Sequence, residues 1–170
     1  MAQYDLLVIG TGPAGQKAAV QAAKLGKKVG IIERKEAVGG VCTNTGTIPS
    51  KSLREAVLYL AGVRQRTIYG ANYRLKETIT IEDLAFRTNH IIKNEIEVVQ
   101  NQLARNDIDL IYGEARFLDL HRPLIQRAGP SIEHPAHIIV IAGGPGPAQH
   151  PGLPYERPPH PTHHTRPPCH

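Results

Sequence analysis

The sequence has no tryptophan, one methionine, two phenylalanines and two cysteines among its 170 residues. Two cysteines cannot supply the disulfide framework of a small secreted domain. No apolar run approaches the roughly 20 residues that a membrane-spanning helix needs. The N-terminus also lacks the basic and apolar segments of a secretory signal. These absences predict a cytoplasmic protein without a membrane partner.

Charge of one sign is not concentrated along the chain. The net charge is +5, from 20 Lys and Arg against 15 Asp and Glu. The basic residues between 24 and 35 are interrupted by acidic and apolar residues. A nucleic-acid-binding surface shows a dense basic patch or stripe. The dispersed charge therefore predicts a solvated surface and no nucleic-acid partner.

Proline and histidine are concentrated at one end of the sequence. Residues 143–170 hold 9 of the 14 prolines and 5 of the 9 histidines, without helix or strand periodicity. Such a composition is typical of disordered segments. The chain thus divides into a domain over 1–142 and a disordered tail over 143–170. A competing interpretation is a weak metal site at His160, His163 and His164, although no fixed ligand geometry is evident.

The first 142 residues alternate between apolar runs and helix-forming segments. The pattern predicts a loop over 39–49, a capping box at Ser52 and Glu55, and proline-rich residues unsuited to strands over 121–136. Strand, helix and strand within the first 33 residues make a βαβ unit. The expected class is α/β, a partial doubly wound (Rossmann-like) domain with a parallel sheet. Strands are expected over 4–9, 29–33, 108–112, 115–119 and 138–142, and helices over 13–25, 50–66 and 80–105.

A glycine-rich turn joins the first predicted strand to the first helix. Gly10 permits a tight turn, Gly12 lets a pyrophosphate approach the backbone, and Gly15 allows close helix–strand packing. Glu33 ends the second strand, where a carboxylate can bind ribose hydroxyls and repel a 2′-phosphate. The turn alone does not separate NAD from FAD, and a turn that serves packing only is the competing interpretation. The matching residues are Gly10, Thr11, Gly12, Pro13, Ala14 and Gly15, and Glu33 and Arg34 complete the expected nucleotide site.

A second motif runs from Gly39 to Lys51. It resembles the G-G-x-C-x-N-x-G-C-x-P-S-K stretch of the flavin-dependent pyridine nucleotide–disulfide oxidoreductases. In that family the stretch lies along the isoalloxazine ring, so the resemblance implies FAD in the first site. It further implies that Ala115 contacts adenine through its backbone and that Lys51 lies near flavin N5. The residues that the resemblance places along the flavin are Gly39, Gly40, Val41 and Cys42.

One departure from this family concerns its second cysteine. The family's disulfide reductases carry two cysteines here, whereas this sequence has Cys42 and then Thr47. A hydroxyl cannot form a disulfide, so a dithiol relay is excluded. Cys42 is interpreted as structural, and no residue is expected to act as a catalytic group. With this threonine, the stretch from Gly40 to Val57 resembles the soluble pyridine nucleotide transhydrogenase branch of the family. In that branch, hydride passes from NADPH through FAD to NAD.

Two alternatives to a transhydrogenase stay open. One is a lipoamide-dehydrogenase-like flavin reductase, against which Thr47 argues. The other is an inactive fragment, because family members continue into a second nucleotide-binding unit and a homo-oligomer interface domain that these 170 residues lack. We expect that the reading frame was lost near residue 159, with an earlier disturbance around 143–147. Translation of the downstream DNA in all frames tests this expectation.

Overall fold

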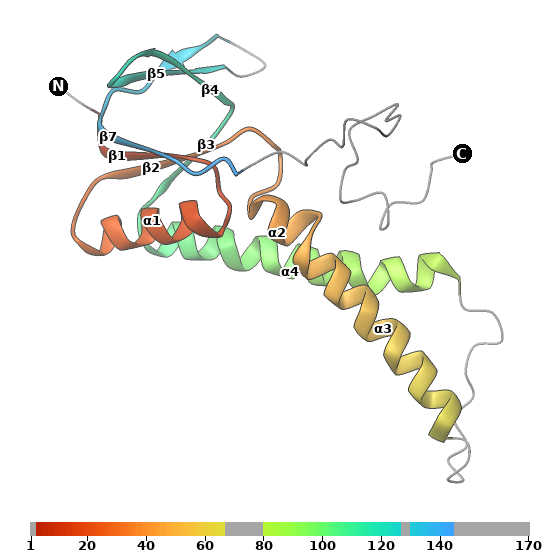
Figure 1. The fold of residues 1–170 in the computed structure, drawn as a ribbon. Helices are drawn as coiled ribbons and strands as arrows, with labels where there is room; N and C mark the ends of the chain where they lie inside the picture. The colour runs from red at the N-terminus through yellow and green to blue at the C-terminus, as the bar shows by residue number, and fades with distance from the viewer. Residues whose placement is uncertain (1–2, 67–79, 127–129, 145–170) are drawn as a thin grey trace, which may run out of the picture.

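The computed structural model of the chain describes residues 3–66, 80–126 and 130–144 (Figure 1). Most of the predicted tail lies outside the described residues, including the three histidines of the alternative metal site. Within the described ranges, none of the helices is long and apolar enough to cross a membrane.

A parallel sheet of four strands forms the centre of the fold. Its order is β3 (Asp109–Tyr112), β2 (Val29–Glu33), β1 (Tyr4–Ile9) and β7 (Ala136–Ile141). Every residue of β2 is buried, as expected for a strand covered on both faces. Because the strands are parallel, their carboxyl ends meet at one edge of the sheet. The predicted α/β class and parallel sheet are confirmed.

Two helices cover one face of this sheet (Figure 1). They are α1 (Pro13–Lys24) and α4 (Ile81–Arg105), both close to their predicted bounds. The buried face of α4 includes Val99 and Leu103, which share a core with residues of β1 and β2. Thr80 begins α4 with a capping box, since its hydroxyl accepts from the Asp83 N–H and the Asp83 carboxylate accepts from the Thr80 N–H.

A small antiparallel sheet covers the opposite face. It contains β4 (Glu114–Asp119), β5 (Arg122–Gln126) and β6 (Ile132–Glu133). Ile125 is fully buried and packs with Leu7, Ile32 and other residues of the parallel sheet. The expectation that residues 121–136 form no strands is therefore wrong. Burial of the apolar side chains of β5 against the parallel sheet outweighs the proline penalty.

Pro123 shows how β5 tolerates a proline. A proline inside a sheet removes one donor from the ladder and is usually confined to edges or bulges. Here the register between β4 and β5 shifts between Phe117 and Asp119, beside the partner of Pro123. The Pro123 carbonyl still accepts a hydrogen bond of 3.1 Å from the His134 N–H. The ladder is thus irregular at the place where the donor is missing.

The predicted loop over 39–49 is another error, because most of it is helical. The segment forms α2 (Gly40–Asn44) and the beginning of α3 (Thr47–Arg66). Pro49 lies in the first turn of α3, where a helix does not use the backbone N–H. The predicted capping box is also wrong, since Ser52 lies within α3 and its hydroxyl donates to the Ile48 carbonyl at 2.9 Å.

Tyr4 gives the fold a pH dependence in the alkaline range. The side chain is 4% exposed. Burial first, and then the hydrogen bond and negative charge of Asp109, raise the pKa of Tyr4 from 10.0 to about 12. The folded protein therefore holds the phenolic proton more tightly than the unfolded chain. The resulting stability is complete below pH 10 and is lost as the pH rises through 12.

A Tyr4→Phe variant isolates this contribution. We expect the free energy of unfolding of the wild type to fall by roughly 2 kcal/mol more than that of the variant between pH 10 and 12. Urea denaturation of both proteins at several alkaline pH values measures the difference. Parallel pH profiles would show that Tyr4 does not carry the effect.

Candidate cofactor site

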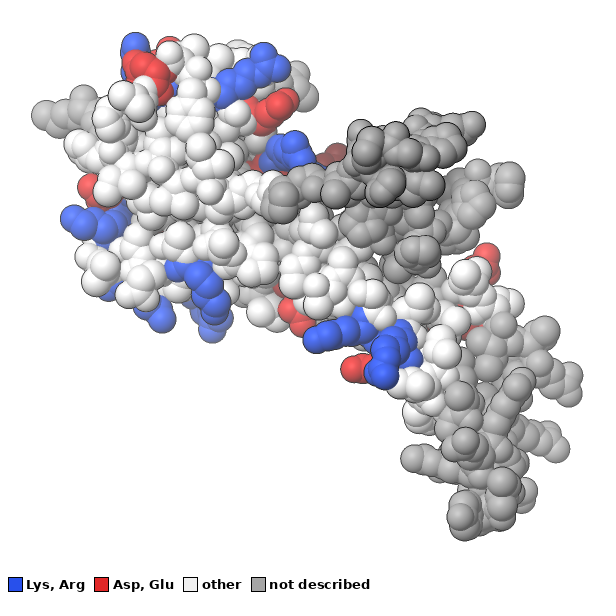
Figure 2. Space-filling model, viewed as in Figure 1, with Lys and Arg blue, Asp and Glu red and all other residues white. Residues whose placement is uncertain are grey.

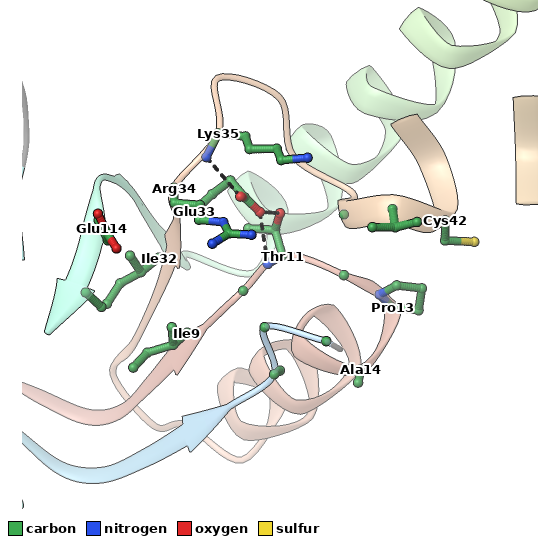
Figure 3. Close-up of a pocket in the computed structure, with 18 of the residues that line it drawn as sticks. Ile9, Thr11, Pro13, Ala14, Ile32, Glu33, Arg34, Lys35, Cys42 and Glu114 are labelled. Carbon is green, nitrogen blue, oxygen red and sulfur yellow. Dashed lines mark hydrogen bonds between the residues drawn. The ribbon is translucent and has the colours of Figure 1, made fainter. Parts of the chain in front are cut away.

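A cavity of about 560 Å³ lies at the carboxyl edge of the parallel sheet (Figure 3). Its size falls within the roughly 300–1,000 Å³ of small-molecule sites. The strand ends of β1 and β2, the turn after β3, the residues that follow β7 and the start of α2 all contribute to it. The expected residues that line this cavity are Gly10, Thr11, Gly12, Pro13, Ala14, Glu33, Arg34, Gly40, Val41, Cys42 and Ala115.

Three expected site residues do not line the cavity. Gly15 is buried in α1, and Gly39 is buried just before α2. Lys51 is exposed on α3, so its predicted position beside a flavin stays a prediction. These three residues come from the same two motifs as the lining residues, which shows that motif membership alone does not place a residue at the cavity.

The sequence analysis also missed several lining residues. Most of them end a strand of the parallel sheet or follow it directly, where ligands of open α/β sheets bind. That rule, applied to every predicted strand, would have identified them. The missed residues are Ile9, Ile32, Lys35, Gly113, Glu114, Ala142, Gly143 and Gly144.

The glycines of the first turn have different roles. A Cβ on Gly15 would lie 1.9 Å from the Gly10 carbonyl oxygen, so this glycine permits the packing of α1 against the turn. Gly10 has a φ of 109°, and a Cβ there would lie 2.6 Å from the Ala142 carbonyl oxygen. A Cβ on Gly12 would meet no atom of the described residues within 4 Å. Gly12 therefore faces open space, as expected where a ligand approaches the backbone.

The N-terminus of α1 has no side-chain cap among the residues that the structure describes. None of their side chains accepts from its first N–H groups, and no acidic residue lies in its first turn. Helices leave these N–H groups without helical partners, and together with the helix dipole they favour an anion. The capping box of α4 shows the contrasting arrangement. The Ala14 and Gly15 N–H groups thus suit a pyrophosphate, whereas the Thr11 N–H donates to Glu33 at 3.3 Å.

Glu33 is 7% exposed and accepts hydrogen bonds from two loops. One carboxylate oxygen accepts from the Lys35 N–H at 3.0 Å. The other accepts from the N–H and the hydroxyl of Thr11 (Figure 3). A carboxylate offers about four acceptor positions, so three donors leave capacity for a ribose hydroxyl. The residues present therefore fit the adenosine ribose of a dinucleotide.

Cys42 lies on α2 with a half-buried, free thiol. Thr47, which replaces the second cysteine of the family motif, is the exposed first residue of α3. Within the described ranges no three His, Cys, Asp or Glu residues are arranged to hold a metal ion. The face in Figure 2 shows lysine and arginine side chains in small separate groups, some beside acidic residues.

Comparisons with known proteins identify the family to which the chain belongs. The model of the family described as FAD dependent oxidoreductase matches residues 5–121. Soluble pyridine nucleotide transhydrogenase of Mycobacterium bovis (strain BCG / Pasteur 1173P2) is 53% identical over 158 residues, which cover 92% of this chain and 34% of that protein. The same-named protein of Colwellia psychrerythraea is 36% identical over 91% of this chain and 33% of its own length. The chain thus spans about a third of these relatives.

A solved flavoprotein structure is similar to the chain in fold and sequence. The Cu(II) complex of HOCl-induced flavoprotein disulfide reductase RclA from Escherichia coli is similar with a TM-score of 0.70 and 29% sequence identity. The similarity covers 89% of this chain and 31% of that chain. The expected fold class and the expected cofactor, FAD, are thereby confirmed. The chain belongs to the FAD-dependent oxidoreductase family.

Proposed function

We propose that this chain is the FAD-binding segment of a soluble pyridine nucleotide transhydrogenase. The observation that carries the proposal is that Cys42 has no cysteine at the second position of the family motif, because residue 47 is threonine. Cys42 is the one free cysteine within the described ranges. The family's dithiol relay needs two thiols to form its disulfide. This favours a transhydrogenase over the lipoamide-dehydrogenase-like alternative, and the 53% identity to the mycobacterial relative supports the same choice.

Different residues of the cavity would bind different parts of FAD. Glu33 would hold the adenosine ribose, and the uncapped start of α1 would hold the pyrophosphate. Ala115 would contact the adenine, and Val41 and Cys42, which line the same cavity, would contact the flavin. When bound, FAD supplies two-electron chemistry, by which hydride from NADPH reaches NAD⁺. The chain's own contribution is to bind and orient the cofactor.

The NADPH and NAD sites belong to the remaining length of the relatives. The sequence has one G-x-G-x-x-G turn, and the proposed FAD site uses it. We therefore place the nicotinamide nucleotide site outside these 170 residues. Residues 1–142 are the proposed FAD-binding domain. A match over 92% of the chain extends past Ala142, so family resemblance continues into 143–170.

Spectroscopy and a turnover assay test the proposal together. Purified chain mixed with FAD is expected to retain the flavin through gel filtration and to show a flavin absorption band. The same 170 residues should reduce no thio-NAD⁺ with NADPH, because they contain a single dinucleotide turn. Loss of the flavin during gel filtration would favour the inactive-fragment alternative.

The assignment to a transhydrogenase is tested on a longer protein. Translation of the downstream DNA should reveal a second glycine-rich nucleotide unit. A protein that includes it should reduce thio-NAD⁺ with NADPH but should not reduce lipoamide. Lipoamide reduction without transhydrogenation would overturn the proposal and support the alternative reductase.

A further inference from the structure

We propose that Thr11 is a positioning residue that fixes both the ribose-binding carboxylate of Glu33 and the glycine turn before α2. This inference rests on the proposed FAD site. The motif treats position 11 as free to vary, because only its glycines have defined roles. In this protein the side chain at that position joins three separate loops.

The hydrogen bonds of the Thr11 hydroxyl carry the inference. Thr11 is completely buried. Its hydroxyl donates to one carboxylate oxygen of Glu33, 22 residues away in sequence. The Thr11 hydroxyl oxygen itself accepts from the Gly39 N–H at 3.1 Å, 28 residues away. One hydroxyl therefore connects the dinucleotide turn, the end of β2 and the approach to α2.

Glu33 depends on these donors because it is a buried carboxylate. Hydrogen bonds to a charged group stabilise more than those between neutral groups, and an unsatisfied buried charge is costly. No lysine or arginine side chain of the described part of the chain forms an ion pair with Glu33. Arg34 and Lys35 are its neighbours in sequence, but both are exposed. The Thr11 and Lys35 donors therefore fix the orientation of the carboxylate at the cavity.

The turn before α2 depends on Thr11 in a similar way. Gly39 and Gly40 both have left-handed backbone conformations, with φ values of 101° and 63°. A Cβ on Gly40 would lie 2.9 Å from the Gly12 Cα, so this turn packs directly against the dinucleotide turn. The Gly39 N–H donates to Thr11 at this contact. Thr11 thus holds the start of α2, which carries Val41 and Cys42, at the proposed pyrophosphate site.

Two substitutions separate the hydroxyl from the volume of the side chain. Thr11→Val keeps the branched shape but removes the donor and the acceptor, whereas Thr11→Ser keeps the hydroxyl. We expect Thr11→Val to weaken the binding of ADP and FAD roughly 10- to 100-fold. The separate variant Thr11→Ser should keep most of the wild-type affinity. Isothermal titration of the full chain with ADP and with FAD measures both effects.

A double-mutant cycle distinguishes positioning from general support of the fold. In a Glu33→Gln background, Thr11→Val should weaken ADP binding much less than in the wild type, because the carboxylate it orients is already gone. Equal losses in both backgrounds would overturn the inference. If Thr11→Val binds ADP as tightly as the wild type, the inference about Thr11 is overturned, but the proposed function is preserved. A wild type that binds neither ADP nor FAD overturns both.

A second measurement needs no variant and therefore does not depend on whether Thr11→Val folds. The Gly39 N–H should exchange slowly with deuterium in the wild-type chain, and addition of ADP should slow it further. Free exchange of this amide in the folded protein would contradict the proposed connection.

Discussion

A Gly15→Ala variant is expected to lose roughly 3 kcal/mol of stability or more. The new Cβ would lie 1.9 Å from the Gly10 carbonyl oxygen and 3.3 Å from the Val8 side chain. Alanine in a helix gains at most about 1 kcal/mol over glycine from its higher helix propensity. Overpacking of a core commonly costs 1–3 kcal/mol, and here the main obstacle is a backbone atom that cannot rotate away. The steric cost therefore exceeds the gain in propensity.

Gly12→Ala is the matched control for this variant. It lies in the same turn, has an extended backbone with φ −67°, and would place its Cβ in open space. Its stability should remain within about 1 kcal/mol of the wild type, since a changed N-cap has effects of that size. Urea denaturation followed by circular dichroism compares the midpoints. Similar midpoints for the two variants would refute the distinct roles given to the two glycines.

Local signals were sufficient to predict the first βαβ unit. The bounds predicted for β1 and β2 match the structure, and α1 ends one residue earlier than expected. In this segment, apolar runs, a proline at the helix start and Gly26 at its end all indicate the same elements. Gly26 has a φ of 72°, the left-handed conformation that ends many helices. Agreement among independent local signals explains the accuracy.

The errors occurred where side-chain contacts that hydrophobic periodicity does not reveal determine the local structure. The sequence around Pro123 argues against a strand, yet β5 forms because Ile125 is buried against the parallel sheet. The segment over 39–49 contains Gly39, Gly40 and Gly46, which indicate a loop. There the Asn44 amide donates to the Val38 and Gly40 carbonyls at 2.9 Å each and closes the short helix α2. Neither contact follows from periodicity.

The residues of the candidate site were predicted more completely than the hydrogen bonds between them. Eleven of the fourteen predicted site residues line one cavity, because the turns after the parallel strands and the starts of α1, α2 and β4 meet at one sheet edge. The motif gave a reason for Glu33 but none for the side chain of Thr11. Their hydrogen bond joins residues 22 positions apart and depends on how the turn packs beside β2. Such pairings require the folded structure.

Gly12→Val is expected to abolish FAD binding while leaving the fold intact. The extended backbone at Gly12 accepts a β-branched residue, and no atom in the described part of the chain lies within 4 Å of a Cβ there. The valine methyl groups would instead enter the cavity beside the uncapped start of α1. A pyrophosphate that must approach this backbone closely would be displaced from its N–H donors. We expect the affinity for FAD to fall at least about 100-fold.

The Gly12→Val measurement needs a control variant at a position of α1 that lies away from the cavity. Lys17 is exposed on α1 and does not line the cavity, so Lys17→Ala should bind FAD like the wild type. Fluorescence titration with FAD and thermal unfolding without ligand should be measured on all three proteins. Gly12→Val should unfold close to the wild type, so its loss of affinity would arise from steric exclusion. Wild-type affinity in Gly12→Val would mean that the pyrophosphate does not approach α1 at this turn, and a different placement of FAD would be required.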